Sequence, residues 1–243
     1  MHVHLPKPLH GWREFVGEVG IIVLGVLIAL TFEQIAEWVS WHARAADARK
    51  ALRAEVGHGF LVSEERKAVA DCVDAQLQRV EAAVIGAGST MTPLPVHSDL
   101  FRFTVRTPIR SWTESAWQSV IYEGVAPHLN DREREFLPIY YAQMQHVRAL
   151  GDQEEVTLGN LVALSQPLRL DAQVQSTFVR EIEGERLRNQ EMAGTAEQMM
   201  HAVERVGYVP SEADRRAWLA ESGTVKFCRE SNFAPPPGPT PKP

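Results

Sequence analysis

The sequence predicts an all-α protein in which an N-terminal transmembrane helix continues into a stalk and is followed by an antiparallel helical bundle. Three observations carry this prediction. An uncharged apolar run extends from Val19 to Phe32. Proline is absent from 37–92 and from 168–209, two segments rich in helix-forming residues. Apolar residues recur there at spacings of three and four, and such stripes are buried by packing helix against helix.

Composition excludes two broad classes of protein. The 243 residues contain 25 Lys and Arg against 31 Asp and Glu, a net charge of -6, so a nucleic-acid partner is not expected. Hydrophobic residues make up 44% and charged residues 23%, which excludes global disorder.

Four segments are expected along the chain. Residues 1–11 form a short tail, 12–41 the transmembrane helix, 42–233 the bundle domain and 234–243 a disordered tail. That last segment holds six of the fifteen prolines.

The membrane segment is predicted from its flanks as well as its centre. A helix from Trp12 to Trp38 is roughly 39 Å long, close to the thickness of a bilayer with its interfaces. Trp12, Trp38 and Trp41 are the expected interface anchors, since tryptophan favours the headgroup region. A signal peptide cleaved near Ala43–Ala45 is the main alternative, and retention as a signal anchor is preferred. Gly25 and Ala29 fit either close helix approach in a homodimer or simple packing against lipid.

Orientation is judged from basic residues and cysteines. The basic residues after the apolar run outnumber those before it, which favours a cytoplasmic C-terminal side, although long domains are translocated regardless of such counts. Cys72 and Cys228 fit either one long-range disulfide or two unrelated buried thiols. The disulfide would require an oxidising compartment, so we expect a periplasmic domain.

Further helices are predicted from caps and stripes. The stalk helix is expected to end at Gly86-Ala87-Gly88, and Phe101–Val105 is interpreted as extended linker. Ser111 to Glu114 resembles a capping box that opens the next helix, and Asn130 to Glu133 opens another. Separate helices are expected over 154–164, over 168–209 with a break at Gly184 or Gly194, and over 211–222.

Motifs for chemistry are missing from the sequence. The nine histidines form no zinc-binding pattern, and no glycine-rich phosphate loop occurs. No catalytic, metal or cofactor residue is therefore predicted, and the protein is not expected to be an enzyme. The acidic pairs at Glu64-Glu65 and at Glu181, Glu183 and Glu185 are interpreted as solvated helix faces.

Aromatic residues concentrate in the middle of the chain. Trp112, Trp117, Tyr122, Tyr140 and Tyr141 lie within about thirty residues, and such side chains anchor interfaces and pockets. Trp112, Trp117, Tyr140 and Tyr141 are the candidates for recognition. The competing interpretation places them in the core with satisfied polar tips.

Two stretches resemble a bacterial family. Trp12-Arg13-Glu14-Phe15, the run from Ile21 to Leu30 and the spacing of Glu33, Trp38 and Trp41 are similar to its membrane segment. The part from Ala116-Trp117 to Tyr140-Tyr141 is similar to its middle. The resemblance implies a single-pass, membrane-anchored helical protein of unknown function, and it implies no reaction or functional residue.

The expected function is therefore non-enzymatic: display of a helical domain for interaction, sensing or scaffolding by a single-pass inner-membrane protein. The lipid bilayer is the expected partner, together with a homodimer through stalk and transmembrane helix. The alternative is a membrane-tethered enzyme or small-molecule-binding module with a pocket near Trp112–Tyr141.

Overall fold

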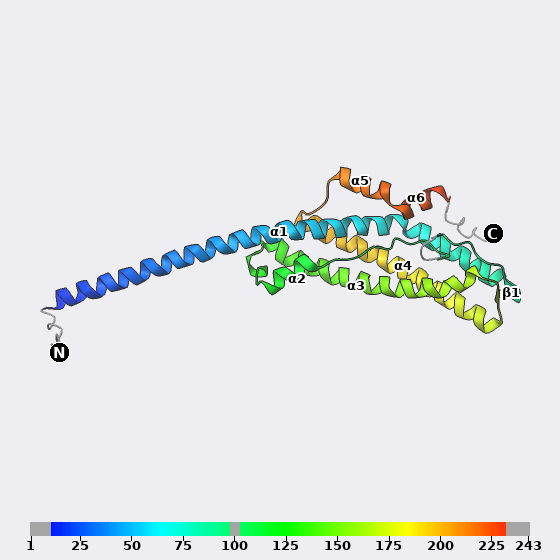
Figure 1. Cartoon of the computed structure of the whole chain (residues 1–243), viewed down its shortest axis with the longest axis horizontal. Coiled ribbons are helices and arrows are strands. Elements are labelled where there is room, and N and C mark those ends of the chain that lie inside the picture. The colour runs from blue at the N-terminus through cyan, green and yellow to red at the C-terminus, as the bar shows by residue number, and fades with distance from the viewer. Residues whose placement is uncertain (1–10, 98–102, 232–243) are drawn as a thin grey trace, which may run out of the picture.

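A computed structural model describes residues 11–97 and 103–231. The predicted tails at 1–10 and 234–243, and the first part of the linker at Phe101–Val105, lie outside the described residues. The all-α prediction is confirmed, because helices account for nearly all regular structure in the described part of the chain (Figure 1).

Helix α1, Trp12–Gly86, is 75 residues long and runs without interruption from the apolar segment into the bundle. Its N-terminal part extends far beyond the other helices (Figure 1). The helix ends at the predicted Gly86, where Ala87 adopts an extended conformation. Gly57 and Gly59 do not end it, since the surrounding helix formers and packed neighbours hold the backbone in place.

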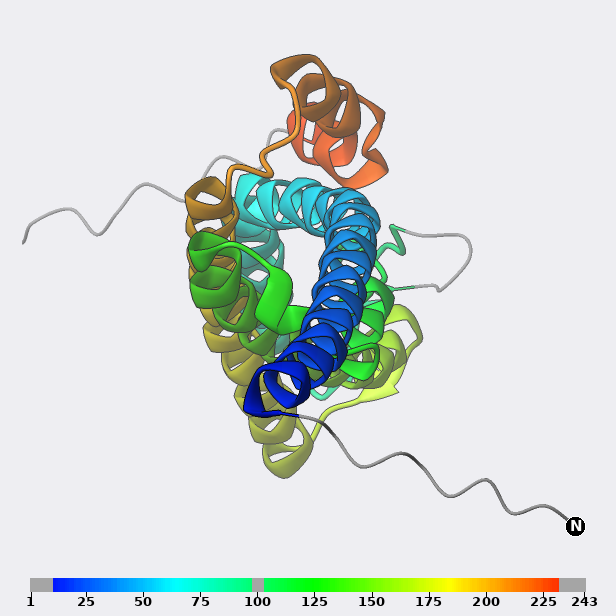
Figure 2. The same ribbon diagram turned by 90° about the vertical axis from the view of Figure 1, so that its left-hand side faces the viewer.

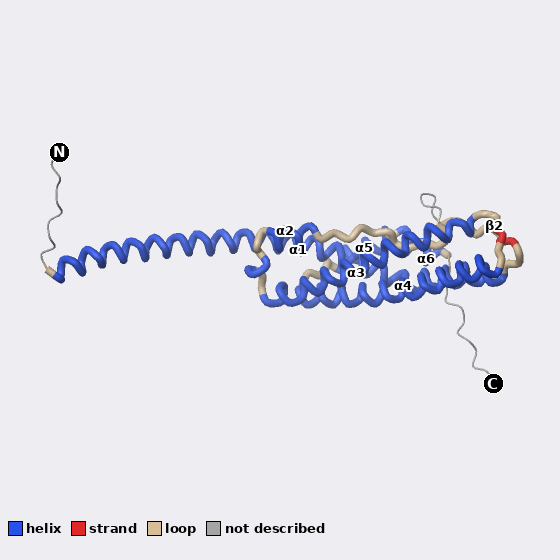
Figure 3. Tube along the Cα trace, turned by 90° about the horizontal axis from the view of Figure 1, so that it is seen from below, coloured by secondary structure: helices blue, strands red, loops and turns tan. Residues whose placement is uncertain are grey.

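Two further long helices complete the bundle. Helix α3, Asp131–Leu161, begins at the predicted capping box, in which Asn130 and Glu133 satisfy each other's backbone amides. Helix α4, Ala172–Val206, packs against both α1 and α3. It runs antiparallel to both, because Gln175 near its start donates to the carbonyl of Val84 near the end of α1, while Tyr208 just after its end donates to Glu133 in the first turn of α3 (Figures 1 and 3).

Several helix boundaries differ from the sequence prediction. The expected separate helix over 154–164 is the C-terminal part of α3, followed by the 3₁₀ helix η2, Val162–Ser165. Gly184 and Gly194 lie inside an unbroken α4, because buried residues on both sides of each glycine pack the helix against the bundle. Helix α5, Glu212–Glu221, is followed directly by an unpredicted helix α6, Gly223–Glu230, because the hydroxyl of Ser222 caps the new helix instead of ending the chain's helical run.

The opening of helix α2, Ser115–Tyr122, also differs from the prediction. Ser111 to Glu114 form no capping box, and Glu114 supplies no side-chain cap. The carboxylate of Glu55 on α1 accepts instead from the amides of Ala116 and Trp117, at 2.9 and 3.3 Å. A tertiary contact therefore satisfies the orphan donors that a local motif was expected to satisfy.

Smaller elements close the two ends of the bundle. Strands β1, Thr90–Met91, and β2, Leu168–Arg169, pair antiparallel at the end far from the N-terminus (Figure 3). The 3₁₀ helix η1, Ala126–His128, lies at the other end between α2 and α3. Helices α5 and α6 form an outer layer against α1 (Figure 2).

Candidate functional site

Four consecutive residues in the middle of α1 form ion pairs with four different segments. Because a helix turns about 100° per residue, their side chains leave α1 in different directions. We call this group, with its partners, the charge belt: Glu64 with Arg215 of α5, Glu65 with Arg110, Arg66 with Glu154 of α3, and Lys67 with Glu197 of α4. The belt thus connects α1 to most of the domain at one level.

Glu65 is the most enclosed carboxylate of the belt, with 0% of its side chain exposed. It accepts two hydrogen bonds from Arg110, at 2.8 and 2.9 Å. It also accepts from Trp218 Nε1 of α5 at 3.1 Å and from Ser222 Oγ at 2.6 Å. Since Ser222 is the cap of α6, one buried carboxylate holds the Arg110 segment and the outer layer together.

Arg66 occupies the centre of the bundle. Its guanidinium donates to both oxygens of Glu154, at 3.1 and 2.8 Å, and to Asn189 Oδ1 at 3.0 Å. Asn189 in turn donates to the carbonyl of Ala70 at 2.9 Å. This arrangement links the three long helices through fully buried polar groups, which stabilises one relative register of the helices at the cost of desolvating them.

Glu185 of α4 lies beside this pair. Burial, together with the negative charge of Glu154, raises the pKa of Glu185 to about 7, against the opposing effect of Arg188 and Arg66. Glu185 forms an ion pair with Arg188, and its other oxygen, Oε1, has no hydrogen-bond partner. The group can therefore bind a proton near neutral pH inside the bundle.

The interpretation of the acidic pairs as solvated helix faces is wrong for two residues. Glu65 and Glu185 are both completely buried. Glu64, Glu181 and Glu183 remain partly exposed. Glu65 is faced by Arg110 from another segment, whereas Glu185 pairs with Arg188 of its own helix and lies near Arg66 of α1. The packing of neighbouring helices that encloses both carboxylates cannot be read from the pattern of one helix.

One signal in the sequence could have identified the central arginine. The apolar stripe of α1 passes through Phe60 and continues at Val69 and Val73. Ser63 and Arg66 occupy the intervening positions at spacing three, so both lie on the buried face. A charged residue on an apolar stripe predicts a buried partner.

A second polar cluster lies at the end of the bundle near the apolar segment. Glu133 accepts from Tyr208 at 2.6 Å and from Arg49 at 3.1 and 3.0 Å. Burial alone would raise the pKa of Glu133, but the hydrogen bonds from Tyr208, from the Asn130 amide and from Arg49 outweigh it and lower the pKa. Glu133 is thus an ionised structural carboxylate joining α1, α3 and the segment after α4.

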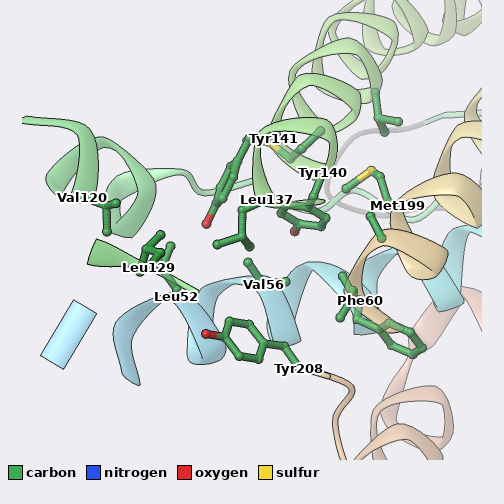
Figure 4. Packing of buried hydrophobic residues seen from close by; sticks show 14 of the residues in the cluster. Leu52, Val56, Phe60, Val120, Leu129, Leu137, Tyr140, Tyr141, Met199 and Tyr208 are labelled. Atoms are coloured by element: carbon green, nitrogen blue, oxygen red, sulfur yellow. The ribbon is translucent and has the colours of Figure 1, made fainter. Parts of the chain in front are cut away.

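The four candidate recognition aromatics all lie in or against the main apolar cluster. Tyr140 and Tyr141 are buried in the main apolar cluster of α1, α3 and α4 (Figure 4). Trp117 stacks on Tyr141 with ring centroids 5.0 Å apart, and Tyr141 donates to Glu55 at 2.6 Å. Burial, with this hydrogen bond, raises the pKa of Tyr141. These three side chains therefore stabilise the core and are not arranged around a pocket.

Trp112 lines a cavity of about 290 Å³ beside this cluster. Ligand pockets generally begin at about 300 Å³. Three of the five charged residues in its wall already have protein partners: Arg110 pairs with Glu65, Glu154 with Arg66, and Arg148 faces Glu114 at 3.9 Å, while Asp152 and Glu155 are exposed. A ligand would have to break these pairs, so the cavity gives little support to a binding site.

A shallower hollow of about 610 Å³ lies between α1 and α2. Small side chains form much of its wall, among them Ala48, Ala51 and Ala116, and Glu55 closes one part of it. The oxygens of Glu55 are used by α2 and Tyr141, so this carboxylate is not free to orient a ligand.

The two cysteines are joined by a disulfide. The sulfur atoms of Cys72 on α1 and Cys228 on α6 are 2.06 Å apart, with 5.9 Å between the Cα atoms. Of the two interpretations left open by the sequence, the structure has the long-range bond, which fastens the outer layer to the bundle.

The three tryptophans expected at the membrane interfaces occupy two environments. Trp12 and Trp38 are exposed on α1. Trp41 is half-buried and stacks on His128 of η1 with ring centroids 4.2 Å apart. Trp41 therefore marks the level at which the free part of α1 meets the bundle.

Comparisons with protein-family models, with curated proteins and with solved structures find no match to this chain. Within residues 11–97 and 103–231, no group of three His, Cys, Asp or Glu side chains could hold a metal ion.

Proposed function

We propose that the chain is a single-pass bacterial inner-membrane protein, anchored by the first part of α1, which presents its helical bundle in the periplasm for interaction, sensing or scaffolding. The role is non-enzymatic in this proposal. The bacterial source and the inner membrane follow from the resemblance of the Trp12–Phe15 and Ile21–Leu30 segments to a family of membrane-anchored helical proteins.

The exposed apolar surface of α1 is the observation that carries the proposal. Of the large hydrophobic side chains that are exposed in the described residues, sixteen of twenty-five lie between Trp12 and Val39. The most apolar 18-residue window of α1 has a mean hydropathy of 2.4, and none of it is buried. Moving that surface from water into hydrocarbon is worth tens of kcal/mol at about 1.5–3 kcal/mol per side chain. The hydrocarbon core of a bilayer, which is roughly 30 Å thick, supplies that environment along α1.

The disulfide supports a periplasmic position for the helical bundle. The Cys72–Cys228 disulfide persists in an oxidising compartment such as the periplasm and is rare in a reducing cytoplasm. The basic residues Arg44, Arg49, Lys50 and Arg53 argue the other way, but their effect is weak when a long domain follows.

A topology experiment tests the proposal. Alkaline phosphatase fused after Pro243 is expected to be active, and a green fluorescent protein fusion at the same place to be dark. Alkaline carbonate washing should leave the full chain in the membrane pellet, whereas a Leu24→Arg/Ile28→Arg variant should be extracted. Extraction of the unaltered chain would contradict the membrane anchor, and an inactive phosphatase with a bright fluorescent fusion would contradict only the orientation.

A homodimer through α1 is the second part of the proposal. Gly25 and Ala29 lie one turn apart on the exposed part of the helix, as in small-residue contacts between membrane helices. Gly25→Leu should lower the dimer fraction in mild detergent, with Gly17→Leu as the control outside the pair. A chain that is monomeric before substitution would contradict the dimer.

A further inference from the structure

We propose that the end of the bundle facing the apolar segment rests on the lipid bilayer, with Tyr122 inserted at the boundary between headgroups and acyl chains. We call this end the proximal surface, formed by Ile121 and Tyr122 of α2 and Pro127 and His128 of η1. The inference rests on the proposed function, because it requires α1 to span the membrane.

The position of the proximal surface along α1 is known from direct contacts. Trp41 stacks on His128, and a Cβ at Gly124 would lie 4.0 Å from the Trp41 ring. The turn that follows α2 is therefore level with Trp41. Trp41 is three residues after Trp38, a rise of about 4.5 Å along the helix.

The membrane interface reaches that level. The exposed apolar surface of α1 ends at Trp38 and Val39. Each headgroup region adds roughly 5–7 Å to the hydrocarbon core, from the difference between the full bilayer and its core. If the apolar surface ends at the hydrocarbon boundary, the turn at Gly124 lies within the headgroup layer.

The chemistry of the proximal surface suits that layer. Tyr122 is 94% exposed and Ile121 is 53% exposed at the C-terminal end of α2. Glu123 is the only Asp, Glu, Lys or Arg between residues 121 and 130, in a chain that is 23% charged. Tyrosine favours the interface because its ring is apolar and its hydroxyl remains hydrated.

Cationic side chains lie just outside this apolar tip. The guanidinium of Arg44 lies 5.1 Å from the centre of the Trp41 ring, and Arg134 donates to the carbonyls of Pro127 and Leu129 at 3.2 Å. With the tip at the bilayer surface, both guanidinium groups would face lipid phosphates, and Arg134 also pairs with Asp131. A lipid surface is favoured over a protein partner because the tip continues directly from the membrane-spanning surface of α1.

A depth measurement on the full chain in lipid nanodiscs tests the inference. Both cysteines of the sequence are joined in the disulfide, so a cysteine introduced elsewhere is the single free thiol. Tyr122→Cys carries an environment-sensitive fluorophore, and the discs contain phosphatidylcholine with a nitroxide at the headgroup or deep in the acyl chain. Ile28→Cys reports on the span, and Leu187→Cys, 66% exposed on α4, is the matched control on the bundle side.

We expect headgroup nitroxide to quench the label at 122 several-fold more than the label at 187, and deep nitroxide to quench the label at 28. Equal quenching at 122 and 187, with strong quenching at 28, would overturn the inference and leave the membrane anchor intact. A label at 122 that is shielded from aqueous iodide but not quenched by lipid would indicate a protein contact and would also overturn it. No quenching at 28 would overturn the anchor itself, and the inference with it.

Discussion

Gly59 of α1 lies directly against the hydroxyl group of Tyr140 on α3, in such close contact that a Cβ atom at Gly59 would overlap the tyrosine oxygen. Both residues are buried, and Tyr140 is among the largest side chains completely enclosed in the core. The absence of a side chain at Gly59 therefore sets the distance between α1 and α3.

We expect Gly59→Ala to destabilise the bundle by about 1–3 kcal/mol, because the added methyl group overpacks the contact with Tyr140. Gly194→Ala is the control: nothing lies within 4 Å of a Cβ there, and replacing a helical glycine should stabilise by roughly 0.5–1 kcal/mol. Thermal unfolding in detergent measures both. Tyr140→Phe should partly rescue Gly59→Ala, and a strictly additive double variant would contradict the proposed contact.

The buried carboxyl group of Glu185 predicts a dependence of stability on pH. Its pKa is about 7 in the fold, above the ordinary 4.5, so between these values the folded chain binds more protons than the unfolded chain. The contribution of Glu185 to the free energy of unfolding therefore falls as pH rises through this window, by about 3 kcal/mol, and is level above it. Denaturant titrations of Glu185→Gln should lack this component.

The comparison with Glu185→Gln isolates the group from opposing ones such as Glu133, whose lowered pKa stabilises the fold at neutral pH and whose contribution is lost only as pH falls below about 4.5. Parallel stability curves for the original chain and the variant between pH 4.5 and 7 would show that Glu185 does not titrate in this window.

Reduction of the Cys72–Cys228 bond should destabilise the domain. The bond closes a loop with a sequence separation of 156, for which loop-closure entropy gives about 2–5 kcal/mol. We expect a lower melting temperature in dithiothreitol and an unchanged value for Cys72→Ser/Cys228→Ser on adding the reductant. Alkylation of both thiols without reduction, in protein taken from native membranes, would show that the bond is not formed in the cell.

Glu65→Ala should loosen the outer layer more than it disturbs the long helices. The substitution leaves Arg110, Trp218 and Ser222 without their shared acceptor, and breaking a buried pair in this way costs about 3–5 kcal/mol. Faster hydrogen exchange is expected in α5 and α6, increasing further when the disulfide is reduced. Glu197→Gln, which breaks the half-exposed pair with Lys67 in the same belt, is the control and should exchange like the original chain. If hydrogen exchange in α5 and α6 were equally fast in Glu65→Ala and in the original chain, Glu65 would not be what fastens the outer layer.

Local signals in the sequence located several helix ends. Asn130 and Ser211 mark true helix starts, and Gly86 marks a true end, because caps act through backbone groups within a few residues of themselves. The apolar run from Val19 to Phe32 predicted a candidate membrane helix without any partner, and the structure leaves all of its residues exposed.

Tertiary structure decided which groups face each other. The sequence left open whether Cys72 pairs with Cys228. The apparent capping box at Ser111–Glu114 does not form, because the distant carboxylate of Glu55 accepts from the backbone of α2 instead. Glu65 and Glu185, which the sequence pattern placed on solvated helix faces, are likewise buried in the tertiary structure. Glu65 is faced by Arg110 of another segment and Glu185 by Arg188 of its own helix, and the spacing along one helix records only the direction in which a side chain leaves it, not what encloses it.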